Sequence, residues 1–326
     1  MSGSRGVSVP PAARELLAGI VDYAGLFPPA SLELSEAARN FESYRNGPDA
    51  WALGRFVAPA GRLEELAYLV GPTIGTSVEA PWALSALVGS DVSSDLEKVR
   101  AVNAQVPRTA TSQERRNNGG LIVDTVELKV DAPVAVAEKL EAIPRSLTAY
   151  VEISLERDPG DFIAALQAAG GRPKIRTGGV TSDSFPPPES LLRFLAACVE
   201  ANLAFKATAG LHHPVAGHYR LTYERDSATT HMYGYLNLLF GTALLRRGAP
   251  DNRVFAALRE VEATAFRFGE DTMSWREYSF GPDEIVSLRQ SGLISFGSCS
   301  FREPLDELTA SFGPERSRVQ PHPNHP

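Results

Sequence analysis

Cysteine is scarce in this chain, and several other class-defining features are missing. Only Cys198 and Cys299 occur in 326 residues, so the chain has no disulfide framework and we expect a reducing compartment. The first residues lack the apolar run of a signal peptide, and no apolar stretch approaches the length of a membrane span. A Gly-x-Gly-x-x-Gly motif is also missing after the first expected strand, which disfavours dinucleotide binding. These absences predict a cytoplasmic protein.

Positive charge is in deficit. The chain carries 32 Lys and Arg against 39 Asp and Glu, a net charge of −7, with a pI near 5.5. This balance argues against nucleic acid or an anionic membrane as the partner. A hydrophobic content of 43% and a charged content of 22% are typical of a folded soluble domain. We expect a small-molecule substrate as the partner and leave a homo-oligomer open.

Short apolar runs alternate with amphipathic stretches along the chain. The expected strands cover residues 19–25, 54–59, 82–89, 124–130, 147–154, 173–179, 204–210 and 294–300. The expected helices cover residues 33–45, 61–69, 93–104, 133–142, 159–169, 188–202, 229–247 and 302–309, with another at 252–266. Parallel strands need such crossovers, and eight units close a (β/α)8 barrel. We predict one barrel over residues 11–312, a flexible start at 1–10 and a disordered tail at 313–326. An open doubly wound sheet is the alternative.

Charged residues recur at alternate positions of the middle strands. Because successive side chains of a strand point to opposite faces, apolar residues such as Val126 and Ile175 are assigned to the helix side. Their neighbours then face the interior: Glu127, Lys129, Glu152, Lys174, Arg176 and Lys206. Active sites of this fold lie at the carboxyl ends of the strands. The set predicts an active site, with a structural ion network as the alternative.

The stretch Phe-Lys-Ala-Thr-Ala-Gly at residues 205–210 resembles a strand of the deoxyribose-phosphate aldolases, class I aldolases built on a (β/α)8 barrel. That strand reads roughly Val-Lys-Ala-Ser-Gly-Gly, and its lysine corresponds to Lys206. The family's preceding strand carries Lys-Thr-Ser-Thr-Gly, whose lysine forms the Schiff base, where this chain has Lys-Ile-Arg-Thr-Gly-Gly. Alignment on Thr177 puts the Schiff-base lysine at Arg176, which cannot form an imine, whereas alignment on the amine puts it at Lys174.

The resemblance implies an aldolase-type lyase acting on a carbonyl compound, with or without a phosphate. Lys174 would be the Schiff-base nucleophile, and Lys206 the cation that lowers its pKa. Glu127 or Glu152 would move protons, and Arg176 would hold a substrate carboxylate or phosphate. The alternative for Lys174 is a structural ion pair with Glu152. This reaction needs no cofactor.

Two adjacent histidines follow the seventh expected strand. We expect His212 to act as an acid or base and His213 to contact the substrate. With His218 and the carboxylates of Glu127 or Glu152, this loop would offer ligands to a divalent metal ion. A metal-dependent barrel hydrolase or isomerase is therefore the second reading. A metabolite-binding barrel without catalysis is the third, because a fold alone does not guarantee turnover.

The stretch Phe-Gly-Ser-Cys-Ser-Phe-Arg-Glu-Pro at residues 296–304 predicts an anion site, since small residues precede a helix start. The residues assigned to substrate binding are Arg176, Lys129, Thr208, Gly210, His213, Gly297, Ser298 and Ser300. The local alternative is a capping box between Ser300 and Glu303. Cys299 is not assigned as a nucleophile, because the sequence identifies no histidine partner for it.

Four further polar or sulfur-containing residues receive local assignments. His231 is expected at the amino end of the helix 229–247, where the helix dipole would lower its pKa. Asn237 is interpreted as structural, and Cys198 as helix packing. Asp22 follows the first apolar run and either points at the site or serves as a turn residue.

Overall fold

The structure is a computed structural model that describes residues 9–74, 81–104 and 120–313. Most of the predicted flexible start, residues 1–8, and residues 314–326 of the predicted disordered tail lie outside these ranges. No helix within them is long and apolar enough to cross a membrane.

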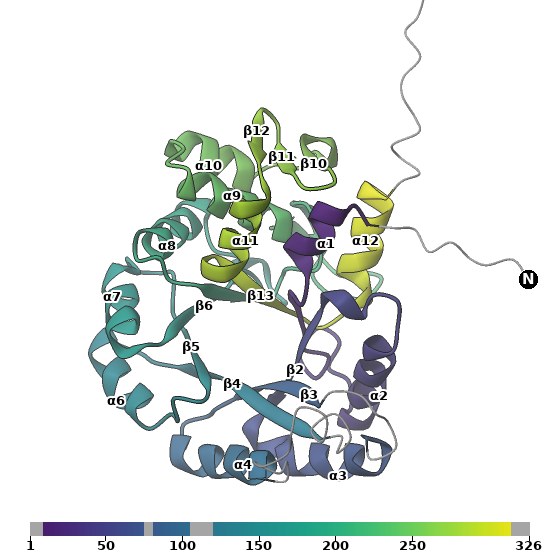
Figure 1. The fold of residues 1–326 in the computed structure, drawn as a ribbon, viewed down its shortest axis with the longest axis vertical. Helices are drawn as coiled ribbons and strands as arrows, with labels where there is room; N and C mark the ends of the chain where they lie inside the picture. The colour runs from purple at the N-terminus through teal and green to yellow at the C-terminus, as the bar shows by residue number, and fades with distance from the viewer. Residues whose placement is uncertain (1–8, 75–80, 105–119, 314–326) are drawn as a thin grey trace, which may run out of the picture.

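Eight parallel strands close into a barrel in the order β1-β13-β7-β6-β5-β4-β3-β2, visible as a ring in Figure 1. Their bounds are β1 Val21–Tyr23, β2 Leu53–Pro59, β3 Trp82–Leu87, β4 Leu121–Lys129, β5 Thr148–Glu152, β6 Arg172–Arg176, β7 Phe205–Thr208 and β13 Leu293–Ser298. The ring is closed by β1 and β13, which pair in parallel with Val21 beside Phe296. The predicted (β/α)8 barrel is confirmed, and the open sheet is excluded.

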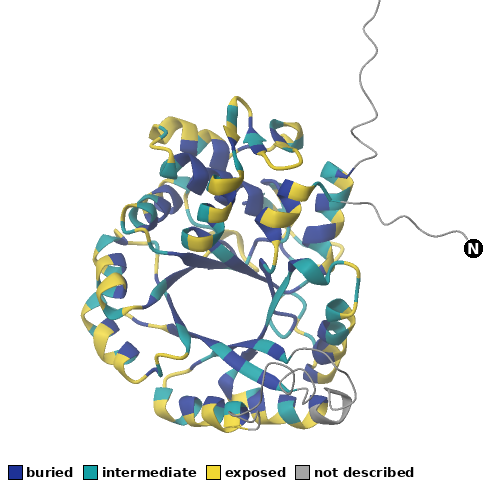
Figure 2. Cartoon of the chain, in the orientation of Figure 1, coloured by how far each residue is buried: buried dark blue, intermediate teal, exposed yellow. Residues whose placement is uncertain are grey.

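Helices surround this ring (Figure 1). Their bounds are α1 Pro11–Leu17, α2 Leu34–Arg45, α3 Leu63–Ile74, α4 Val92–Ala104, α6 Val136–Glu141, α7 Gly160–Ala169, α8 Pro188–Glu200, α9 Tyr235–Arg246, α10 Asp251–Leu258, α11 Pro282–Ser291 and α12 Arg302–Phe312. In α8 the buried residues Leu191, Phe194, Leu195 and Cys198 recur at three- and four-residue spacing, so one face of the helix packs inward. Figure 2 shows the same pattern around the ring. The assignment of Cys198 to helix packing is confirmed.

Two predicted helices are wrong in part. The helix expected at 229–247 begins only at Tyr235, because Thr229–Met232 forms strand β9, antiparallel to β8 (Gly217–Arg220). Adjacent threonines are β-branched and favour a strand. The helix expected at 252–266 ends at Leu258 as α10. It is followed by a small antiparallel sheet of β10 (Phe266–Phe268), β11 (Met273–Trp275) and β12 (Tyr278–Phe280).

Asn237 is fully buried in α9. Its side-chain oxygen accepts the backbone N–H of Ala216 at 2.8 Å. Its amide donates to the carbonyl oxygens of Ala257 at 2.7 Å and Glu260 at 2.8 Å. Asn237 therefore ties the loop after β7 to the end of α10, which confirms the structural interpretation.

Candidate active site

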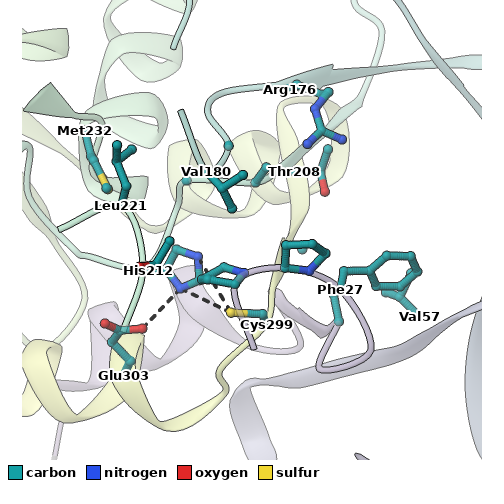
Figure 3. Close-up of a pocket in the computed structure, with 18 of the residues that line it drawn as sticks. Phe27, Val57, Arg176, Val180, Thr208, His212, Leu221, Met232, Cys299 and Glu303 are labelled. Atoms are coloured by element: carbon teal, nitrogen blue, oxygen red, sulfur yellow. Dashed lines mark hydrogen bonds and ion pairs between the residues drawn. The ribbon is translucent and has the colours of Figure 1, made fainter. Parts of the chain in front are cut away.

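A cavity of about 590 Å³ opens at the carboxyl ends of the barrel strands. Its lining includes the last residues of five successive strands, namely Leu87, Lys129, Glu152, Arg176 and Thr208. Loops after β1, β7 and β13 complete the wall (Figure 3). Active sites of (β/α)8 barrels lie at this face, so the cavity is the candidate site.

Five charged side chains form a continuous chain of ion pairs at the inner end of this cavity. Lys206 Nζ lies 2.6 Å from Asp22 Oδ2 and also contacts Glu127 Oε1. Lys174 Nζ lies 2.8 Å from Glu127 Oε2 and 2.8 Å from Glu152 Oε2. Glu127 thus joins the two lysines, and the predicted ion pair between Lys174 and Glu152 is present.

The register of the strands explains why these groups meet. Lys174 pairs with Lys206 across β6 and β7, and Glu152 pairs with Lys174 across β5 and β6. Residues in register on parallel neighbours share a face of the sheet. Alternation therefore predicted the inward orientation of these side chains correctly, together with that of Glu127 on β4.

Asp22 is the one member of this series of ion pairs whose orientation the sequence left undecided. Its side chain is 1% exposed, and it accepts the backbone N–H of Arg55 at 2.7 Å and the hydroxyl of Ser295 at 2.8 Å. A strand of three residues, Val21–Tyr23, is too short for alternation to assign a face. The sequence feature that could have indicated its inward orientation is a single acidic residue between Val21 and Tyr23.

The pKa values of these ion-paired side chains are set by competition between burial and pairing. Burial alone would raise the pKa of Glu127, but the ammonium groups of Lys206 and Lys174 outweigh it and hold that pKa well below its ordinary value. Burial alone would lower the pKa of Lys206, but Asp22 and Glu127 outweigh it and the pKa is raised. Burial alone would also raise the pKa of Glu152, but the ammonium group of Lys174 outweighs burial, and the pKa is lowered. At neutral pH Lys206 is therefore a fixed cation.

Two further predicted cations lie at the outer edge of the site. The Lys129 side chain is 74% exposed, and its Nζ is 3.4 Å from Glu152 Oε1. Arg176 is exposed at the end of β6 and lies beside Thr208 of β7 (Figure 3). Within the described ranges Arg176 forms no ion pair, so its guanidinium is available to a substrate anion.

A second cluster lines the same cavity beyond the ends of β7 and β13 (Figure 3). His212 Nδ1 lies 3.1 Å from Glu303 Oε2, and both ring nitrogens lie 4.0 Å from Cys299 Sγ. Tyr223 Oη is 3.4 Å from that sulfur and 3.2 Å from Glu303 Oε2. Cys299 therefore has a histidine partner, which the sequence alone did not identify.

Burial and pairing also compete in this cluster. Burial would lower the pKa of His212, but the hydrogen bonds with Cys299 and Glu303 outweigh it and raise the pKa to about 10. Burial would raise the pKa of the Cys299 thiol, but His212 outweighs it and the pKa is lowered. The sequence did not reveal this pair, because the two residues lie far apart along it. They meet because β7 and β13 are neighbours in the barrel and each residue follows the end of its strand.

The predicted anion cradle is only partly directed at the cavity. Gly297, Thr208 and Gly210 line it. Ser298 is buried, and its hydroxyl donates to the Ser300 carbonyl oxygen at 2.7 Å. The hydroxyl of Ser300 accepts the Glu303 N–H at 3.1 Å, which forms one half of the alternative capping box. Both serine side chains are thus engaged within the protein.

His213 belongs to a third arrangement at the rim. Its Nδ1 lies 2.9 Å from both carboxylate oxygens of Glu307, and its ring stacks on Tyr219 with centroids 3.4 Å apart. Ligand atoms of His213, Glu303 and Glu307 all lie within 4.8 Å of one another. These three residues could hold a divalent metal ion.

The other predicted histidines lie elsewhere. His218 on β8 and His231 on β9 face each other across the hairpin with ring centroids 5.7 Å apart. His218 therefore does not join His213 in a ligand set. The pKa of His231 is lowered, as predicted, but burial and the neighbouring His218 cause the shift. The expected position at a helix start is wrong, because α9 begins four residues later.

No family model, curated protein or solved structure matches this chain. Its function must therefore be inferred from the geometry of its own residues.

Proposed function

We propose that this protein is an aldolase-type lyase that breaks or forms a carbon–carbon bond through an imine on Lys174. One observation carries the proposal. Lys174 and Lys206 lie in register on adjacent strands and share Glu127 inside a cavity at the carboxyl ends of the strands. This arrangement provides one amine for covalent chemistry and one fixed cation beside it.

The two lysines differ in a way that favours Lys174 as the nucleophile. Lys206 is 1% exposed, lies between Asp22 and Glu127, and has a raised pKa. It therefore keeps its proton. Lys174 is 6% exposed, and its partner Glu152 is 10% exposed and also lines the cavity. A substrate can thus reach the Lys174–Glu152 pair more readily than Lys206.

The proposed reaction begins with proton transfer from the Lys174 ammonium to Glu152, which lies 2.8 Å away. The neutral amine then adds to the substrate carbonyl, and the resulting hydroxyl takes the proton from Glu152 and leaves as water while the iminium forms. The iminium accepts the electron pair of the bond between its α and β carbons, which leaves an enamine on Lys174, while a base removes the hydroxyl proton of the departing aldehyde. Glu152 is the proposed base, because Glu127 is held between two lysines.

The spacing of the aldolase motif agrees with this assignment. The alignment that puts the family's lysine at Arg176 matches the first threonine of Lys-Thr-Ser-Thr-Gly to Thr177. When the final Thr-Gly pair is matched to Thr177 and Gly178 instead, the lysine coincides with Lys174. Thr177 links the two strand ends, since its hydroxyl donates to the Ala209 carbonyl oxygen at 2.6 Å. Arg176 is then free to bind a carboxylate or phosphate of the substrate.

A metal-dependent hydrolase or isomerase is the second candidate, on the grouping of His213, Glu303 and Glu307. It has weaker support, because His213 Nδ1 is already hydrogen-bonded to Glu307. A ligand-binding barrel without turnover is the third reading, and an absence of any product would favour it.

Borohydride trapping with a panel of small aldehydes and ketones tests the proposal, read by intact mass and peptide mapping. We expect a reduced adduct on Lys174 that is lost in Lys174→Met and retained in the matched Lys129→Met control. An adduct on Lys206 would reverse the roles of the two lysines. No adduct on folded protein would reject imine chemistry, and activity lost to a chelator would then favour the metal-dependent candidate.

A further inference from the structure

Cys299 occupies a different environment from the other cysteine of the chain. Cys198 is surrounded by the apolar packing of α8. Cys299 lies one residue beyond β13, lines the cavity, and faces polar groups from three separate segments. An unreactive buried cysteine behaves as a small apolar side chain and needs no such groups.

The polar groups around the sulfur come from three loops. His212, from the loop after β7, lies 4.0 Å from Sγ. Tyr223, from the β8–β9 hairpin, lies 3.4 Å from it. The backbone of Ala30, from the loop after β1, contributes to lowering the pKa of the Cys299 thiol. A sulfur held among converging donors is the arrangement of a reactive cysteine.

The remaining partners of His212 orient its ring for proton transfer. Glu303 Oε2 lies 3.1 Å from Nδ1, and Ser298 Oγ lies 3.3 Å from the same atom. The 4.0 Å separation from sulfur is long, and such contacts commonly shorten when substrate binds. Apolar side chains, including Phe27, Leu221 and Met232, wall this part of the cavity (Figure 3).

We propose that Cys299, with His212 as its proton carrier, is a second nucleophile of this cavity and captures aldehydes as hemithioacetals. In the thiolate–imidazolium form of this pair, Sγ forms a bond to the carbonyl carbon. The π electron pair moves to the carbonyl oxygen, which takes the proton from the His212 imidazolium, and the addition reverses when that proton returns. The addition is reversible and needs no oxidant or reductant.

This inference goes beyond the proposed lyase and is chemically independent of Lys174. In the lyase reaction, the aldehyde released on bond cleavage would be formed within the cavity that Cys299 lines. Capture at sulfur would retain that fragment while the other fragment remained bound to the amine. The substrate class is therefore a carbonyl compound that yields a small aldehyde.

Competition between an aldehyde and an alkylating agent tests this inference on the full chain. Iodoacetamide labelling is followed by peptide mapping, with Cys198 as the internal control. We expect Cys299 to label about tenfold or more faster than Cys198, and His212→Gln to slow the labelling of Cys299. Glycolaldehyde should slow labelling of Cys299 in the wild type and equally in Lys174→Met.

The outcomes separate this inference from the lyase proposal. Protection of Cys299 without any borohydride adduct on Lys174 would support the second nucleophile and reject the lyase. An adduct on Lys174 with no protection of Cys299 by glycolaldehyde would do the reverse. Equal labelling of Cys299 and Cys198 in folded protein would also overturn the inference. Circular dichroism of each variant establishes that the fold is retained.

Discussion

Replacing Lys206 with Met should strongly destabilise the barrel. The substitution keeps a similar volume but removes the ammonium group between Asp22 and Glu127. All three side chains are at most 3% exposed, so water cannot replace the lost partner. The variant would leave two carboxylates buried with one fewer positive charge between them.

The magnitude follows from the partners that remain. Breaking one buried ion pair by removing a partner costs about 3–5 kcal/mol. Two pairs are broken here, but Asp22 retains Ser295 and Glu127 retains Ser85, whose hydroxyl donates at 2.6 Å. Glu127 also retains Lys174. We therefore expect a total loss of about 3–5 kcal/mol rather than twice that amount.

The matched control is Lys129→Met, the same substitution on another barrel strand. Lys129 is 74% exposed, and its ion pair with Glu152 spans 3.4 Å, so the expected loss is about 0–1 kcal/mol. Urea unfolding followed by circular dichroism measures both variants at neutral pH. A difference between them of less than about 1 kcal/mol would refute the reasoning that Lys206 neutralises buried carboxylates. Adding Asp22→Asn to Lys206→Met should recover part of the loss.

Three further perturbations have defined outcomes. The lowered pKa of Glu127 and the raised pKa of Lys206 predict that their stabilisation is fully present between about pH 4.5 and pH 10. This stabilisation should decrease at pH values below the window, where Glu127 becomes protonated, and at pH values above it, where Lys206 loses its proton. A free energy of unfolding, measured in urea, that stays constant outside the window would contradict this. Gly210→Ala should cost about 2 kcal/mol or more, since φ is +74° and an added Cβ would lie 3.0 Å from a backbone atom of Gly178. The control is Gly170→Ala, where φ is the same and an added Cβ meets open space, so the expected cost is about 1 kcal/mol. Thermal melts compare the two variants, and equal losses would refute the steric contribution at Gly210. Asn237→Ala should cost about 2–3 kcal/mol, because it leaves the Ala216 N–H and the Glu260 carbonyl oxygen without this partner, and the Ala257 carbonyl oxygen with the Glu260 N–H at 3.3 Å; a loss below about 0.5 kcal/mol in urea unfolding would show that other groups replace it.

The barrel and its inner charges could be predicted from the sequence for a physical reason. Strand-helix alternation reflects backbone periodicity, and the two-residue period of a strand assigns a face to each side chain. Glu127, Lys174 and Lys206 occupy strands whose apolar neighbours require the helix side, so their inward orientation followed directly. The same reasoning failed after β7, where Thr229–Met232 forms a hairpin strand inside a segment with helical periodicity.

The contacts between loops were decided only by the tertiary structure. Asp22 joined the charged chain because closure of the barrel brings β1 beside β13, and its three-residue strand carries too little periodicity to assign a face. His212 and Cys299 are separated by 87 positions, and no local pattern links them. Their side chains meet because β7 and β13 are neighbours, and the loop conformations beyond those strands set the final distance. The periodicity of the chain thus determined which side chains enter the barrel, whereas closure and loop geometry determined which of them touch.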